Sequence, residues 1–175
     1  MDFKKLALNI EAATRQAFFE MVRLHASEGI YGFALYSDEG AMTVCPSTNT
    51  LKHLAESDPN DRLYYKYEPA TWKYEMEGAD EAFEEISSLL NEEVMANEDD
   101  EDWFEDFQKK LFETCVKVLE KLKNEGFFKK TAGKDIFLTF TVSDYDFEPR
   151  DMDRIAKRLN DNAYTKEYVN WIRNM

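Results

Sequence analysis

Residues 30–45 read IYGFALYSDEGAMTVC, and this stretch is the clearest sign of a β-sheet in the chain. Its two apolar runs are rich in β-branched and aromatic side chains, and Ser37-Asp38-Glu39-Gly40 between them has the composition of a tight turn. The stretch therefore predicts a β-hairpin whose first strand runs from Ile30 to Ser37. Because proline cannot donate a backbone hydrogen bond, we expect Pro46 to end the second strand.

Two further stretches are read as strands. Residues 134–144, KDIFLTFTVSD, alternate two apolar faces, which predicts a strand in the interior of the sheet. Residues 63–68, LYYKYE, are rich in tyrosine and are expected to form a third strand closed by Pro69. The following segment, ATWKYEME, fits either an extended strand or a helical turn.

Apolar residues at three- and four-residue spacing predict amphipathic helices around these strands. Asp2 can cap the first helix, Asp99 or Asp102 can cap the fourth, and Pro149 suits the first position of the fifth. One of Ser47, Thr48 and Asn49 is expected to cap the second, short helix. The predicted helices cover residues 2–27, 50–57, 79–95, 99–125, 149–159 and 165–173.

These elements predict one domain over residues 1–175, because a chain of this length can bury a sizeable core without covalent cross-links. We expect an α+β fold in which an antiparallel or mixed sheet of three to five short strands packs with five to six helices. Connections long enough to hold a helix also permit some parallel strand pairing.

Negative charge is concentrated in one segment. The chain has a net charge of −14, and residues 75–108 contain fifteen acids without a lysine or arginine. Within it, residues 97–106 read NEDDEDWFED. Carboxylates favour a helix amino terminus, which accounts for two or three of these acids. We expect the remainder to form an acidic face that repels nucleic acids and anionic membranes and attracts basic proteins.

The predicted partner is therefore a basic protein. The residues expected to contact it are Glu98, Asp99, Asp100, Glu101, Asp102, Trp103 and Asp106. Trp103 is included because tryptophan often supplies much of the binding energy at protein interfaces. A regulatory or structural domain whose acids only keep it soluble is the plainer alternative.

A second region has tyrosine and tryptophan at high density in an otherwise polar segment. Side chains of this kind occur at interfaces, but a sheet edge packed under a helix would have the same composition. The alternative function is a small-ligand binder or an enzyme with a pocket near the loop after the last strand. The residues assigned to that pocket are Tyr65, Tyr67, Trp72, Asp144 and Asp146.

The sequence contains few motifs of the kind that support catalysis or cofactor binding. It contains no phosphate-binding loop, dinucleotide fingerprint or GxSxG turn, so no catalytic residue and no cofactor is predicted. His25 and His53 lack the spacing of a zinc site, and EDDED lacks the glycine of a calcium loop, so no metal site is expected. Cys45 and Cys115 are expected to be reduced, buried thiols.

No secretory signal and no apolar run of membrane-spanning length occurs in the sequence, so we expect a cytoplasmic protein. Neither the charge nor the motifs predict an oligomeric state.

The order of these features resembles the bacterial domain of unknown function 4303 family. A long first helix is followed by YGFALYSDEGAMTVCPSTNT at residues 31–50, by YEPATWKYE at 67–75, and by a late apolar strand running into SDYD. The resemblance spans nearly the whole chain, and its most specific part is the hairpin leading into Pro46 and Asn49-Thr50. It implies a single-domain bacterial cytoplasmic protein with no assigned activity. By analogy with other small acidic α+β families, an immunity-type role against a basic toxin is a further expectation.

Overall fold

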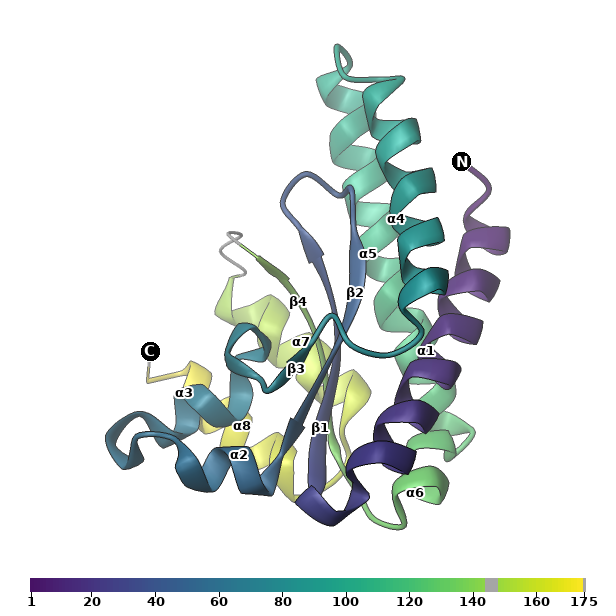
Figure 1. Cartoon of the computed structure of the whole chain (residues 1–175). Helices are drawn as coiled ribbons and strands as arrows, with labels where there is room; N and C mark the ends of the chain where they lie inside the picture. Colours follow the sequence, from purple (N-terminus) through teal and green to yellow (C-terminus); the bar gives the residue numbers. More distant parts are fainter. Residues whose placement is uncertain (144–147, 175) are drawn as a thin grey trace.

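The hairpin predicted from residues 30–45 lies at the centre of a four-stranded mixed sheet (Figure 1). The computed structural model describes residues 1–143 and 148–174. The strands are β1 (Ile30–Asp38), β2 (Val44–Thr50), β3 (Tyr74–Glu75) and β4 (Phe137–Ser143). The helices are α1 (Phe3–His25), α2 (Leu51–Glu56), α3 (Arg62–Tyr67), α4 (Asp80–Met95), α5 (Glu101–Asn124), α6 (Phe127–Ala132), α7 (Pro149–Leu159) and α8 (Ala163–Ile172). The predicted α+β class is confirmed.

Strand order in the sheet is β3-β2-β1-β4. β1 pairs with β2 and β2 pairs with β3 in antiparallel fashion, whereas β1 pairs with β4 in parallel. The parallel pair needs a crossover, and the connection that contains α4 and α5 supplies it. β4 is therefore an edge strand, and its predicted interior position is wrong. The apolar residues on both of its faces reflect helices packed against each face rather than strands on both of its edges.

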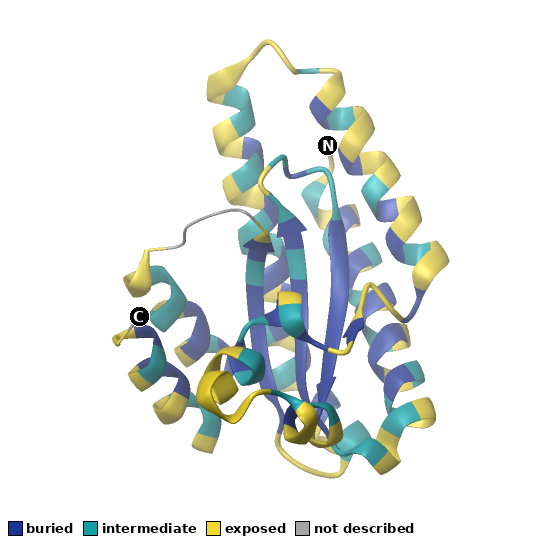
Figure 2. Ribbon diagram, turned by 60° about the vertical axis from the view of Figure 1, so that its left-hand side comes forward, coloured by how far each residue is buried: buried dark blue, intermediate teal, exposed yellow. Residues whose placement is uncertain are grey.

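The helices form a layer on each face of the sheet. One face carries α1, α4 and α5 and contains the larger core, in which Phe33, Leu35 and Leu138 are buried. The other face carries α7 and α8 together with the short helices α2 and α3, and its smaller core contains Tyr67 and Phe137. In Figure 2 the strands are almost entirely buried between these layers.

The strand predicted over residues 63–68 is wrong, because these residues form α3. Asp58 starts a 3₁₀ turn at Pro59–Asp61, and this turn leads directly into the helix. Carbonyl groups of α3 then find partners on the sheet, since Asn49 Nδ2 donates to Tyr65 O at 3.2 Å and the Tyr31 hydroxyl donates to Lys66 O at 3.0 Å. These tertiary hydrogen bonds outweigh the strand propensity of tyrosine.

β2 continues through Pro46, so the predicted end of this strand is also wrong. The carbonyl of Pro46 accepts a hydrogen bond from Met76 N at 2.9 Å, so the backbone of Pro46 faces the β3 side of β2. The N–H that Pro46 lacks would face the same side, so its absence disrupts no pairing with β1. β3 itself is only two residues long. Because the strand extends further, Thr50 caps α2 instead of a residue from 47–49, with its hydroxyl accepting from His53 N at 3.2 Å.

The segment at residues 70–77, for which the sequence fits two conformations, contains both. A 3₁₀ turn covers Pro69–Thr71, and the short strand β3 follows at Tyr74–Glu75. Helix α6, which the sequence pattern did not predict, begins after Gly126 in the left-handed conformation with φ of 71°.

Candidate functional site

Helices α4 and α5 form an antiparallel hairpin that extends beyond the end of the sheet (Figure 1). Each helix buries one apolar stripe against the larger core. The buried residues are Phe83, Ile86, Leu90 and Val94 on α4 and Phe107, Leu111, Cys115, Val116, Val118, Leu119 and Leu122 on α5. Carboxylates on the opposite faces are consequently directed toward solvent. We call residues 80–106 the acidic arm.

The connection between the two helices is short and hydrogen-bonded. Asn97 Nδ2 donates to Glu93 O at 2.8 Å, and Asp100 N donates to Asn97 O at 3.1 Å. The carboxylate of Asp100 accepts from Trp103 N at 2.9 Å and so caps α5. A cap at Asp99 or Asp102, as the sequence predicts, is therefore wrong, although the helix start itself is confirmed.

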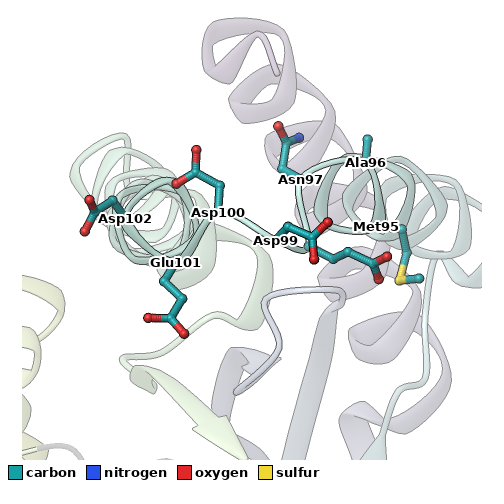
Figure 3. Close-up of a pocket in the computed structure, with 8 residues that line it drawn as sticks. Met95, Ala96, Asn97, Asp99, Asp100, Glu101 and Asp102 are labelled. Carbon is teal, nitrogen blue, oxygen red and sulfur yellow. The ribbon is translucent and has the colours of Figure 1, made fainter.

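Residues 95–102 line an open pocket of about 700 Å³ at the end of the arm (Figure 3). In Figure 3 the carboxylates of Asp100, Glu101 and Asp102 point in three different directions instead of converging. Within residues 1–143 and 148–174, no group of three histidine, cysteine or carboxylate side chains could hold a metal ion. The geometry at this end of the arm is that of a charged surface with Met95 as an apolar patch.

Few of the arm's charges are compensated. Among the described residues, ion pairs reach only Glu93, Glu105 and Asp106 of the arm. Glu93 accepts from the amino group of Met1 at 2.7 Å, while Lys109 and Lys110 pair with Glu105 and Asp106 at 3.0 and 2.5 Å. The last two pairs are largely exposed, and such pairs contribute little to stability. Within the described part of the chain, the carboxylates of residues 98–102 therefore form no ion pair.

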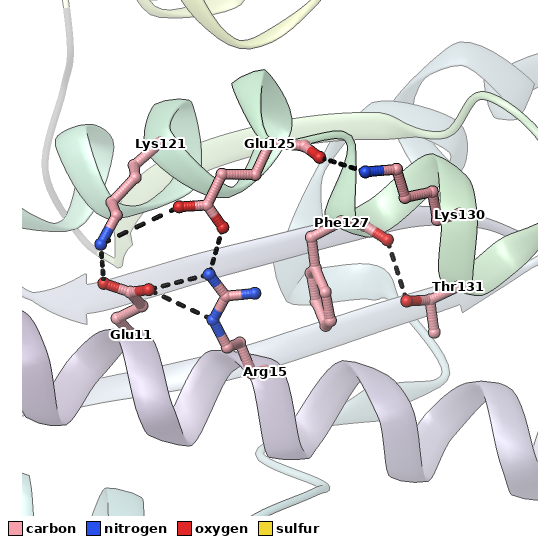
Figure 4. Close-up of polar contacts among 7 residues, drawn as sticks. All are labelled: Glu11, Arg15, Lys121, Glu125, Phe127, Lys130 and Thr131. Carbon is pink, nitrogen blue, oxygen red and sulfur yellow. Dashed lines mark hydrogen bonds and ion pairs between the residues drawn. The ribbon is translucent and has the colours of Figure 1, made fainter.

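Other cations pair with acids outside the arm. Figure 4 shows Glu11 accepting from Arg15 at 2.9 Å and from Lys121 at 2.6 Å, with Glu125 pairing with the same two cations. The ammonium group of Lys121 lowers the pKa of Glu11, against a smaller opposing effect of burial. We call these four residues the α1–α5 ion network.

A second such cluster lies on α5 and α7. Arg158 pairs with Glu120 at 2.8 Å and with Glu113 at 2.9 Å, and these hydrogen bonds raise its pKa. Both clusters leave the charge of the arm unchanged.

Trp103 differs from the neighbouring carboxylates because part of its surface is already packed against the protein. Its ring stacks on Phe107 with centroids 4.7 Å apart, and it packs against the larger core. Trp103 is thus half-buried and offers a partner only one side of its ring. Asp106 is exposed and carries the ion pair with Lys110.

The aromatic segment assigned to a second site contributes mainly to packing. Tyr67 and Trp72 are buried in the smaller core, where the Tyr67 ring contacts Phe137 edge-on at 4.9 Å between centroids. Tyr65 is half-buried. Asp144 and Asp146 lie outside the described residues, so the structure does not test their assignment to this pocket.

The histidines contact neighbouring side chains or backbone, and the cysteines are buried. His25 stacks on Tyr74 with centroids 4.0 Å apart and hydrogen-bonds its hydroxyl at 2.9 Å, while His53 Nε2 lies 3.3 Å from Thr71 O. Cys45 and Cys115 are free and buried, as expected. Burial raises the pKa of Cys45 to about 11 and also raises that of Cys115, so both thiols stay protonated near neutral pH.

Among the exposed apolar residues of α1, Leu8 and Phe19 were not predicted to form a surface feature. The signal was present, because neither fits the three- and four-residue spacing of the buried positions Leu6, Ile10 and Ala17. Both residues therefore contribute apolar area to the solvent-exposed face of α1, beside the arm.

A family model described as a domain of unknown function (DUF4303) matches residues 10–161. The chain belongs to the DUF4303 family. The matched region runs from the first half of α1 to just beyond α7, so the DUF4303 domain includes the whole sheet and the acidic arm. No curated protein and no solved structure matches the chain. None of the helices in the described residues has the length and apolar composition needed to cross a bilayer.

Proposed function

We propose that the protein is a non-enzymatic binding module whose acidic arm docks onto a basic protein. The observation that carries this proposal is the projecting hairpin, on which residues 98–102 have no cationic partner among the described residues. A surface of one sign raises the rate of association with an oppositely charged partner by roughly 10- to 1000-fold at low salt. Met95 and the free side of Trp103 add apolar contact area beside these charges.

In its sharpest form, the proposal is an immunity-type role in which the arm neutralises a basic toxin. A toxin that cleaves nucleic acid must present a positive surface to phosphate groups. A projecting hairpin with clustered carboxylates can occupy such a surface in place of the substrate. The same carboxylates disfavour binding of the domain itself to nucleic acid or to an anionic membrane.

The proposal is tested by capturing basic proteins from the source organism on the immobilised domain and measuring association rates over a salt series. An arm variant, Glu98→Gln with Asp99→Asn and Asp102→Asn, removes three charges but keeps the Asp100 cap. A matched variant replaces Glu56, Asp61 and Glu148 in the same way; these residues are also exposed and lie outside the arm.

The arm variant should associate at least about tenfold more slowly at low salt, and this difference should shrink as salt rises. The matched variant should stay close to the unmodified domain. Equal effects of the two variants would show that net charge alone acts, and a captured partner indifferent to the arm variant would refute the proposal.

A further inference from the structure

The outer face of α1 carries an apolar row that no element of the described structure covers. Leu8 and Phe19 are 64% and 59% exposed, and they are three helical turns apart, which places them in one row on the helix. Ala12, also exposed, lies between them in this row. Single exposed apolar residues are ordinary, but apolar residues aligned along one helix face form a stripe of the kind that packs against another element.

Basic residues lie at both ends of this row, and the two acids beside it, Glu11 and Glu20, already accept from Lys121 and from Ala79 N. Lys4, Lys5 and Arg23 are exposed on α1, and they form no ion pair within the described residues. The adjacent face of α4 has the opposite charge, with Glu81, Glu84, Glu85 and Glu92 exposed around Leu89, which is 45% exposed. The two helices thus present complementary rows, one cationic and one anionic, each with an apolar residue.

Two contacts fix how these helices pass each other. The amino group of Met1 binds Glu93 at 2.7 Å, and Glu20 accepts from Ala79 N at 2.9 Å, so α1 and α4 are antiparallel neighbours (Figure 1). Leu89 lies one turn before Glu93 and is therefore level with the first turns of α1, which carry Leu8.

We propose that this α1–α4 face binds the same face of a second copy of the chain, forming a two-fold symmetric dimer. A two-fold axis parallel to the helices places α1 of each copy on α4 of the other, antiparallel as in a four-helix bundle. Leu8 then meets Leu89 of the second copy, Lys5 meets its Glu92, and Arg23 meets its Glu81. Every contact forms twice, and both complementary surfaces come from one sequence.

This dimer is independent of the proposed partner site. The contacts use α4 from Glu81 to Glu92, whereas residues 98–102 at the end of the arm stay outside the dimer and free to bind. A dimer would present two arms, so loss of the dimer and loss of partner binding are separate outcomes.

Mass in solution tests the proposal. Sedimentation equilibrium over a range of concentrations should show the mass rising from the chain mass of 20.6 kDa toward twice that value. Leu8→Glu with Phe19→Glu should weaken the dimer by about 100-fold or more, because each charge would be buried twice. Leu51→Glu with Leu63→Glu, two exposed leucines on α2 and α3, should leave it intact.

A charge exchange tests the arrangement itself. Lys5→Glu alone and Glu92→Lys alone should each weaken the dimer, and the two together should restore it, because each residue faces the other in the second copy. Circular dichroism confirms that every variant is folded. A chain that stays at 20.6 kDa, a dimer unaffected by Leu8→Glu with Phe19→Glu, or a charge exchange without restoration would overturn the proposal.

Discussion

Gly32 lies where the Trp72 indole crosses the sheet. A Cβ atom at Gly32 would come within 2.9 Å of the ring carbon Cη2 of Trp72, closer than carbon atoms pack. Trp72 is 4% exposed and is held edge-on by Tyr31 and Phe137, each with its ring centroid 6.4 Å away, so it has little room to shift. The small size of Gly32, rather than its backbone freedom, is what the structure requires.

Gly32→Ala should therefore lower the free energy of unfolding by about 1–3 kcal/mol, through overpacking against the indole ring. The cost should be smaller in a Trp72→Leu background, where the ring is absent. Urea unfolding of the two single variants and the double variant measures this coupling. Equal costs of Gly32→Ala in both backgrounds would show that the strain lies elsewhere.

At the scale of secondary-structure elements, the α1–α5 ion network joins helices that are far apart in the sequence. Glu11 receives Arg15 from its own helix and Lys121 from α5, and its side chain is only 14% exposed. Lys121 is the main reason that the pKa of Glu11 is lowered from its usual 4.5. A carboxyl group whose pKa is lowered on folding stabilises the fold when ionised.

This linkage predicts a pH dependence. The contribution of Glu11 should be complete above its unfolded pKa of 4.5 and should disappear as pH falls through its lower folded pKa. We expect Glu11→Gln to be less stable than the unmodified protein near pH 7 by up to about 1 kcal/mol, a difference that vanishes at strongly acidic pH. Urea unfolding of both proteins at a series of pH values measures it. A difference that persists in acid would indicate lost packing rather than lost charge.

Elements with strong periodicity were predictable, and those that depend on tertiary contacts were not. The long helix α1 and the hairpin β1–β2 follow from spacing and turn residues alone. Helix α3 was mistaken for a strand because its tyrosines favour strands, while the hydrogen bonds from Asn49 and Tyr31 that settle its conformation come from remote residues. The sequence does not reveal that β4 is an edge strand, because a strand buried on both faces has the same apolar pattern as a central strand.

At the scale of the whole molecule, the dominant feature is a charge imbalance. The acidic arm carries most of the net charge of −14, and the ion networks elsewhere leave it uncompensated. Clustered carboxylates repel one another, and dissolved salt screens this repulsion over distances of about 10 Å at 0.1 M.

Added salt should therefore stabilise the protein. We expect its melting temperature to rise by about 2–4 °C between low and moderate salt, which corresponds to roughly 1 kcal/mol for a chain of this size. The arm variant, with residues 98, 99 and 102 neutralised, should melt higher at low salt and respond less. Calorimetry over a salt series measures both effects, and an identical salt response of the two proteins would place the repulsion outside the arm.

The charge of the candidate site was readable from composition, but its shape was not. A run of acids at residues 97–106 predicts an acidic helix start wherever it lies. The projection of the hairpin depends on how far α4 and α5 extend past the sheet, which is set by packing between distant segments. The assignment of Tyr67 and Trp72 to a pocket likewise could not anticipate that the smaller core would enclose them.

Strand order also has a consequence for synthesis of the chain. β2 follows β1 directly, but the other edge of β1 is completed only by β4, which leaves the ribosome after the entire arm. Until then the nascent chain holds an open strand edge able to pair with a neighbouring polypeptide. The carboxylates of the arm emerge during this interval, before β4 covers the second edge of β1.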